Sequence, residues 1–420
     1  MSGLAISQAP PPSRPLRFLL TATVWGVLAG GWLAWCGDLA LTSRWATPSI
    51  ALVHLFTLGV LGNAMLGSLL QFLPVAAASP LALGRGTFWL HGIYNLGVAA
   101  LVFGLAQLHP PSLMIASALL AASLLAFAFM AWRALARGQG DATLRTGIAR
   151  ATLSLAATVA LGAVLVGIVL GLFPAPADRV ADVHAATGLF GWTFVLMVAV
   201  GSVTMPMFQG TATVASRLIK AWMLLAASGL LVGAILRVMG HTTALAIGIG
   251  MPALLAVLAS LWLQWRIRHR RNPALTAFWF SGSLAVGAGA CLLLAPVALQ
   301  IDTAMLVGVL VIAVGLPLML LGMLLEIVSF LAWIGLRRQC PRGRRVPGVD
   351  RLLPERDKLA LLAMHLLASA GLLAALHWPA LSSAAGVTLV CAYAATASAV
   401  LRCHHRADRF IALTAETAPT

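Results

Sequence analysis

Long apolar stretches separated by short polar loops make up most of this chain. Twelve of these stretches are long enough to be transmembrane helices, because crossing about 30 Å of hydrocarbon takes roughly 20 apolar residues. The pattern therefore predicts an all-α, polytopic membrane protein with about 12 transmembrane helices. The expected spans are 17–36, 50–77, 88–107, 112–134, 150–172, 182–208, 219–236, 242–265, 276–298, 303–335, 357–376 and 382–402.

The loops between the spans are too short to hold a soluble domain. The first residues contain the stretch APPPSRP and lack the early apolar core of a signal peptide. We expect residues 1–16 to be a flexible N-terminal tail, residues 17–402 a single 12-helix transmembrane domain, and residues 403–420 a cytoplasmic tail.

Composition supports the membrane prediction. The chain is 61% hydrophobic and only 9% charged, whereas about 25% of the residues in soluble domains are charged. So few charges cannot cover a soluble surface of this size, so most of the surface must face lipid. The five cysteines form no CxxC pair, which indicates neither a disulfide framework nor a thiolate metal site.

The basic residues orient the predicted spans. With a cytoplasmic N-terminus, only Arg44, Arg179 and Arg237 of the 27 Lys and Arg residues fall on the outer side. This asymmetry follows the positive-inside rule and predicts a multi-pass protein of the cell inner membrane with both termini in the cytoplasm. It also accounts for the net charge of +16 without nucleic acid. The Arg-rich loop at 336–358 is expected to lie on anionic lipid headgroups.

Two predicted helices share a histidine pattern. The second reads HLFTLGVLGNAMLGSLLQFLP from His54, and the sixth reads HAATGLFGWTFVLMVAVGSVTMP from His184. Each places a His about one turn below the outer end, follows it with repeated glycines, and ends with a Pro near the inner face. Four helices separate the two patterns, which indicates a repeating four-helix unit.

The residues below His184 suggest a use for the pattern. Gly188 and Gly191 stand at i+4 and i+7 from His184, on its own helix face. Missing side chains there would open a slot for a flat macrocycle, and neutral imidazoles from two facing helices can hold haem iron. The alternative is that each His hydrogen-bonds to a neighbour and each Gly serves only packing.

Together these features resemble subunit I of the haem-copper oxidases. The shared features are twelve helices, cytoplasmic ends, and a His near the outer end of helix 2 followed by Gly-rich sequence and a Pro. The resemblance implies three arcs of four helices with helices 2, 6 and 10 as inner members, so that His54 and His184 fall on the first two. A looser resemblance links the chain to the haem-containing NnrS membrane proteins of nitric oxide metabolism.

The chain also departs from that family. The predicted tenth helix lacks the family's HxH pair, and the seventh lacks the paired copper-binding histidines. His241 follows the seventh helix, but one His does not make a three-His copper site, so copper and full oxygen reduction are not expected. The resemblance then implies one haem b with His54 and His184 as axial ligands and His241 as the next candidate ligand.

Three further ionisable residues lie within predicted spans. His91 and His365 could form a second site for a haem or quinone, or could be hydrogen-bonded core residues. Glu326 could carry protons or pair with a loop arginine.

The leading hypothesis is a haem-binding membrane protein that transfers electrons or handles or senses a diatomic gas such as nitric oxide. If it is an enzyme, it would be an oxidoreductase, working with a redox partner or a second subunit. The alternative is a 12-helix secondary transporter, although two matching halves of six helices are not evident. A third hypothesis is an assembly protein whose histidines are structural.

Overall fold

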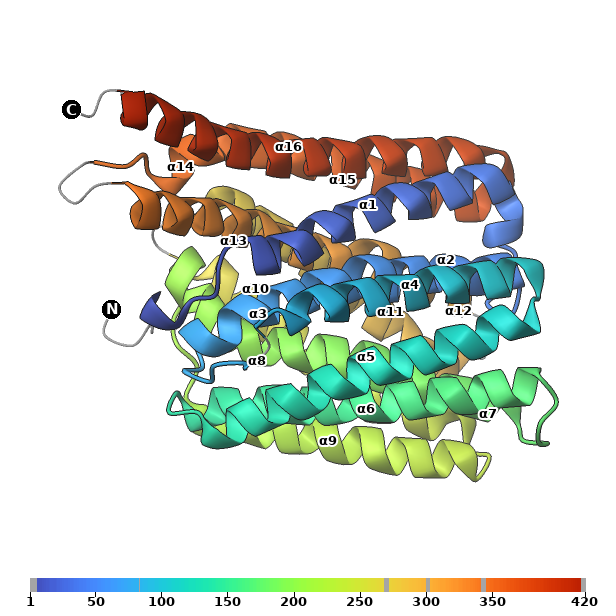
Figure 1. Cartoon of the computed structure of the whole chain (residues 1–420). Coiled ribbons are helices and arrows are strands. Elements are labelled where there is room, and N and C mark those ends of the chain that lie inside the picture. Colours follow the sequence, from blue (N-terminus) through green and yellow to red (C-terminus); the bar gives the residue numbers. More distant parts are fainter. Residues whose placement is uncertain (1–5, 83, 268–271, 300–302, 341–344, 417–420) are drawn as a thin grey trace.

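The computed structural model describes residues 6–82, 84–267, 272–299, 303–340 and 345–416. These residues form helices and no strand (Figure 1). Twelve helical stretches among them are long and apolar enough to cross a membrane, which confirms the predicted class and number. The spans are Ser13–Ala40, Thr47–Val75, Gly86–Gln107, Pro110–Arg137, Ala142–Val169, Ala177–Gln209, Ser216–Val238, Thr242–Trp265, Pro273–Ala295, Ala304–Gln339, Glu355–His377 and Pro379–Leu413.

The two chain termini lie at the same end of the bundle (Figure 1). We call this the terminal end and the opposite one the distal end. Some predicted features fall outside the described residues. They are the tail residues 1–5 and 417–420, and Arg268, Arg270, Arg271, Arg342 and Arg344 of the basic loops.

Helices at both chain ends reach beyond the predicted boundaries. The first helix begins at Ser13, inside the predicted N-terminal tail, because Pro15 in its first turn needs no amide partner. Just before it, Arg338 donates to the carbonyl oxygens of Ala9 (2.7 Å) and Pro10 (3.2 Å). The last helix continues past residue 402 to Glu416.

Helices that follow one another in the chain pack side by side as three arcs of four. The arc containing both chain ends consists of α15 (Glu355–His377), η7 (Pro379–Leu381), α16 (Ser382–Glu416), α1 (Ser13–Cys36), η2 (Gly37–Ala40), α2 (Thr47–His54), η3 (Leu55–Gly62) and α3 (Asn63–Val75). The next consists of α4 (Gly86–Gln107), α5 (Pro110–Arg137), α6 (Ala142–Val169), α7 (Ala177–Ala185), η4 (Ala186–Phe194), α8 (Val195–Thr204) and η5 (Met205–Gln209). The third consists of α9 (Ser216–Val238), α10 (Thr242–Trp265), α11 (Pro273–Leu299), α12 (Ala304–Gly308), η6 (Val309–Gly315) and α13 (Leu316–Gln339). Short helices η1 (Ile6–Gln8) and α14 (Val349–Leu352) lie outside the arcs.

The last span of each arc is an inner one. In the second, sixth and tenth spans, 72%, 67% and 56% of the most apolar 18-residue stretch is buried inside the protein, whereas in the other nine spans the buried share is 17–50%. This is the arrangement of three arcs with inner helices 2, 6 and 10 that the resemblance implied. The hydrophobic core therefore lies among these three spans, and the outer nine present more of their surface to lipid.

The three inner spans also share a local distortion. Every π-helical segment among the described residues lies in one of them. Segment η3 begins directly after His54, η4 begins two residues after His184, and η6 begins directly after Gly308. π-Helical segments are rare in proteins, and where they occur they often lie at functional sites. Their recurrence agrees with the predicted four-helix repeat.

Side chains satisfy carbonyl groups within the π-helical segments. In η3 the Tyr94 hydroxyl, from α4, donates to the Leu58 carbonyl oxygen at 2.6 Å. A Cβ atom on Gly62 would lie 2.1 Å from that hydroxyl oxygen, so only glycine fits there. In η4 the Thr193 hydroxyl donates to the Gly188 carbonyl oxygen at 3.0 Å. These bonds replace water, which hydrocarbon cannot supply.

The first and last spans, α1 and α16, close the ring of helices (Figure 1). Glycines bring their backbones into contact. A Cβ on Gly386 would lie 2.3 Å from the Ala34 nitrogen, and one on Gly30 would lie 2.6 Å from the Val390 nitrogen. Small residues are the usual means of such close helix packing in membranes.

We therefore predict that Gly30→Val lowers the stability of the bundle by about 1–3 kcal/mol, since the added carbons overpack the α1–α16 contact. The neighbouring Gly31→Val is a matched control because nothing lies within 4 Å of a Cβ built there. Thermal unfolding of both variants in detergent measures the difference. Equal melting temperatures for the two would contradict the tight contact.

Candidate functional site

The structure brings the two predicted histidines together near the distal end. His54 and His184 are each the eighth residue of an inner span that starts at that end. Their ring centroids are 6.3 Å apart and the ring planes differ by 28°. Equal depth on two neighbouring helices therefore places the imidazoles side by side, with nearly parallel planes.

Hydrogen bonds define which nitrogen of each ring is protonated. His54 Nδ1 lies 2.8 Å from the Ile50 carbonyl oxygen, and His184 Nδ1 lies 3.0 Å from the Thr158 carbonyl oxygen. A carbonyl oxygen can only accept, so both Nδ1 atoms carry the hydrogen and donate it. Each Nε2 atom then has a free lone pair. Metal-binding histidines are commonly oriented in this way by a hydrogen bond from their other ring nitrogen to a backbone carbonyl.

The distance between the two ring centroids can be compared with that of two imidazoles bound to one metal ion. A metal–imidazole bond is about 2.0–2.1 Å long, and a ring with bonds near 1.33 Å has a radius of about 1.1 Å. Two such ligands on opposite sides of one metal ion have ring centroids about 6 Å apart. The observed centroid separation of 6.3 Å is close to that value, so the two histidines could together hold a haem iron.

One face of α6 positions the His184 ring. Besides the Thr158 carbonyl, this face carries Gly162, where an added Cβ would lie 3.2 Å from His184 Cε1. A larger residue at this position would press on the ring. Sequence reasoning missed both residues. A backbone carbonyl has no signal in a sequence, and Gly162 is one of many glycines in the spans.

The two glycines below His184 also lie against α6. A Cβ on Gly188 would lie 3.1 Å from the Thr158 methyl carbon, and one on Gly191 would lie 2.7 Å from the Ser154 hydroxyl oxygen. The glycines therefore allow α6 to pack closely along η4. Their role in binding a cofactor stays a prediction.

An ion-pair cluster at the distal end links the elements that carry the two histidines. Asp182 accepts from Arg44 at 2.7 Å and from Arg237 at 2.8 Å, and Arg237 also donates to Asp178 at 2.7 Å. Arg44 precedes α2, the aspartates belong to α7, and Arg237 lies near the end of α9. Because Asp182 stands two residues before His184, this cluster restrains the two rings relative to each other.

The third candidate ligand is elsewhere. His241 is exposed, directly before the first residue of α10. Within the described residues, no group of three or more His, Cys, Asp or Glu side chains could hold a metal ion. His241 therefore does not join His54 and His184 in a three-ligand cluster, and the site consists of two histidines.

The two histidines of the proposed second site are each hydrogen-bonded to a threonine. His91 Nε2 is 2.9 Å from the Thr21 hydroxyl between α4 and α1, and His365 Nε2 is 3.0 Å from the Thr396 hydroxyl between α15 and α16. These contacts fit core residues that join neighbouring helices. They supply no observation in favour of a second haem or quinone site at these residues.

Glu326 pairs with Lys358, from the first turn of α15, and both side chains are buried. The partner is thus a lysine of the next span rather than a loop arginine. Two opposite charges removed from water stabilise each other only as a pair, since either one alone would carry an uncompensated desolvation cost.

A polar network that the sequence reasoning did not identify lies beside η3. The Trp25 indole donates to Asn95 Oδ1 at 2.6 Å, and the amides of Asn63 and Asn95 bond to each other at 2.9 and 3.1 Å. It joins α1, α3 and α4 around the second span. The missed signal was an asparagine inside each of two apolar spans, since such residues need partners in lipid.

Known proteins add no assignment to this site. No protein-family model matches the chain, and a search of curated proteins finds no significant match. The candidate site therefore rests on the residues and contacts described above.

We predict that Asp182→Asn destabilises the distal end by about 1–3 kcal/mol, because it removes charge-assisted hydrogen bonds to Arg44 and Arg237. Asp38→Asn serves as the control, because Asp38 is exposed at the same end and its carboxylate forms no ion pair in the described structure. Thermal melting of both variants tests this. A loss no larger than that of Asp38→Asn would show that the cluster contributes no stability.

For the buried pair, we predict that Glu326→Leu costs about 3–5 kcal/mol, because it leaves Lys358 buried and unpaired. The double variant Glu326→Leu/Lys358→Met should recover most of that loss, since no charge then remains. Melting temperatures of the wild type, the single variant and the double variant measure the effect. A double variant as unstable as the single one would refute the coupling.

Proposed function

We propose that the chain binds one b-type haem between His54 and His184, near the distal end of the bundle, and uses it for electron transfer. The observation that carries this proposal is the pair of nearly parallel imidazoles with centroids 6.3 Å apart. Each ring donates from Nδ1 to a carbonyl oxygen, which turns its Nε2 lone pair into the available ligand.

The surrounding residues have defined tasks in this proposal. The carbonyls of Ile50 and Thr158 orient the rings and raise the basicity of the ligating nitrogens. Gly162 leaves room for the ring of His184. The Asp182 ion pairs restrain the helices that carry the ligands. When bound, the haem supplies a one-electron redox centre whose potential depends on these ligands and on burial.

The ligand count bears on the choice between electron transfer and gas chemistry. Two histidines would together hold the haem iron, whereas reactive metal sites keep a position open for their substrate. The pair therefore favours electron transfer with a redox partner or second subunit. Handling or sensing of nitric oxide requires one imidazole to leave. In either case an enzyme of this kind would be an oxidoreductase.

We also propose the orientation that the arginines indicate, in the cell inner membrane with both termini in the cytoplasm. The location of both termini at the same end of the bundle supports this orientation. The rival transporter hypothesis finds less support, because the repeat among the inner spans is of four helices, whereas many carriers consist of two six-helix halves.

We predict that the purified protein shows a reduced-minus-oxidised spectrum with a b-type α-band. The band should be lost in His54→Gly and in His184→Gly, because each variant removes one axial ligand. The control is His377→Gly, because His377 is the last residue of α15 and its ring meets the Trp378 ring edge-on rather than the ring of His54 or His184.

Free imidazole sharpens this test. Added to either His→Gly variant, imidazole can occupy the vacated space and should restore the band, which would separate ligand loss from misfolding. A colourless, folded protein from haem-replete cells would refute the proposal and favour the transporter or structural alternatives.

A further inference from the structure

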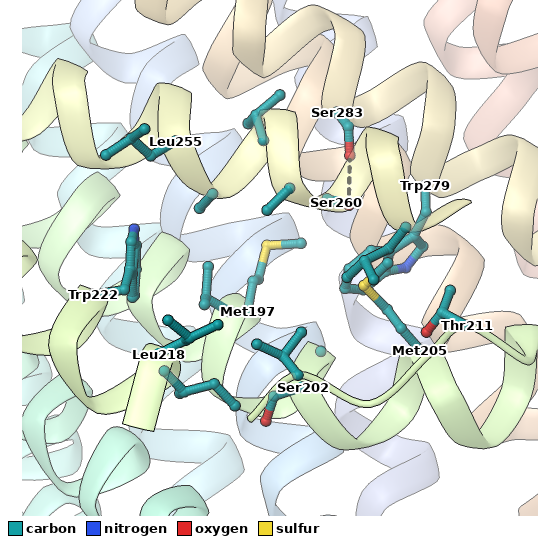
Figure 2. Close-up of a pocket in the computed structure, with 18 of the residues that line it drawn as sticks. Met197, Ser202, Met205, Thr211, Leu218, Trp222, Leu255, Ser260, Trp279 and Ser283 are labelled. Carbon is teal, nitrogen blue, oxygen red and sulfur yellow. Dashed lines mark hydrogen bonds between the residues drawn. The ribbon is translucent and has the colours of Figure 1, made fainter. Parts of the chain in front are cut away.

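Two cavities lie toward the terminal end of the bundle, away from the two histidines. One cavity, of ≈ 260 Å³, lies between the sixth span and the helices of the third arc (Figure 2). The other, of ≈ 320 Å³, lies among the three inner spans. Met197, Trp279 and Met319 line both, so Trp279 stands where the two meet. Gln71, which lines the second cavity, follows His54 by 17 residues, a helical rise of about 25 Å.

Several buried polar atoms around this junction have no hydrogen-bond partner among the described residues. They are Trp279 Nε1, both amide atoms of Gln71, and the hydroxyls of Thr204 and Thr211. All four side chains are more than nine-tenths buried and line one or both cavities. Unpaired polar groups in such surroundings are costly, and native structures seldom keep them. Their concentration at two cavities indicates that a ligand supplies the missing partners.

The atom types describe that ligand. An indole N–H can only donate, so the atom opposite Trp279 must be an acceptor such as a carbonyl oxygen. Gln71 and Thr204 add donors from other sides of the same junction. The rest of the wall is apolar, with thioether and aromatic groups that suit a flat conjugated ring.

The first cavity also opens toward lipid. Leu218 of α9 and Leu255 of α10 line it and are 60% and 48% exposed on the outside of the bundle. Figure 2 shows them beside Trp222 at one side of the cavity, with Trp279 at the other. The Trp222 indole already donates to the Pro252 carbonyl oxygen at 2.9 Å, so it is not available to a ligand. One side of the cavity is thus lined by residues of α9 and α10 at the lipid-facing surface, and Trp279 lines the other.

We infer that these cavities bind a lipid-soluble quinone. Its ring lies at Trp279, with one carbonyl oxygen accepting from the indole and another accepting from Gln71 or Thr204, and its apolar tail passes between Leu218 and Leu255. The two carbonyls match the unpaired donors that line the cavities. This site stands on its own contacts and does not depend on haem binding.

The test uses the full chain in lipid nanodiscs and ubiquinone-1, a benzoquinone with one isoprene unit, as the probe. Equilibrium dialysis against empty nanodiscs corrects for partition into lipid. The wild type should bind saturably. Trp279→Phe should weaken binding about tenfold, since it removes one hydrogen bond to a buried acceptor and keeps a ring in place. Trp262→Phe is the matched control, because Trp262 is 52% exposed on the lipid side of α10.

Gln71→Leu provides a second variant of similar volume in case Trp279→Phe fails to fold, and melting temperatures check that each variant is intact. No saturable binding by the wild type would overturn the inference and leave water as the partner of the buried atoms. Unchanged affinity in folded Trp279→Phe and Gln71→Leu would also overturn it, by placing the quinone elsewhere.

The same titration on His54→Gly separates this inference from the haem proposal. A variant without haem that still binds quinone at wild-type affinity supports a separate site. A protein that binds haem but shows no saturable quinone binding refutes the quinone site alone.

Discussion

Hydrocarbon contains no water, so each backbone amide and carbonyl in the spans must find its hydrogen-bond partner within the protein. Regular helices meet this requirement by themselves, which is why the described membrane spans are helical. The inner spans depart from regularity at their π-helical segments, and there neighbouring side chains complete the bonding. Tyr94 does so for Leu58 and Thr193 for Gly188. The site at His54 and His184 lies where two of these departures begin.

Hydropathy predicted the twelve spans because lipid imposes a length and a polarity on each of them. It also placed His54 and His184 at one depth, since parallel helices that start at the same face share a depth scale. The rotation of each helix about its axis is a different matter. This rotation depends on how neighbouring helices pack. It determines that Gly188 and Gly191 face α6 and that Glu326 pairs with Lys358 rather than with a loop arginine.

Backbone groups set a further limit on what could be predicted from the sequence. The carbonyls of Ile50 and Thr158 determine the tautomer of each imidazole, yet a carbonyl is common to all residues and leaves no trace in a sequence. The polar residues Asn63 and Asn95 were visible, but their partnership across α3 and α4 follows from the three-dimensional arrangement. The structure also explains the three arginines that depart from the predicted charge pattern. The exceptions to the basic asymmetry, Arg44, Arg179 and Arg237, each hold a partner at the distal end.

The glycine contact between α1 and α16 has a consequence for biogenesis. Helix α1 packs through Gly30 on α16, which carries Gly386 and is made much later than α1. During synthesis, α1 enters the membrane long before its partner exists, so its small-residue face spends that interval against lipid or an insertion factor. The contact between the two helices can form only after α16 has been made. A chain that stopped before α16 would leave that side of α1 uncovered.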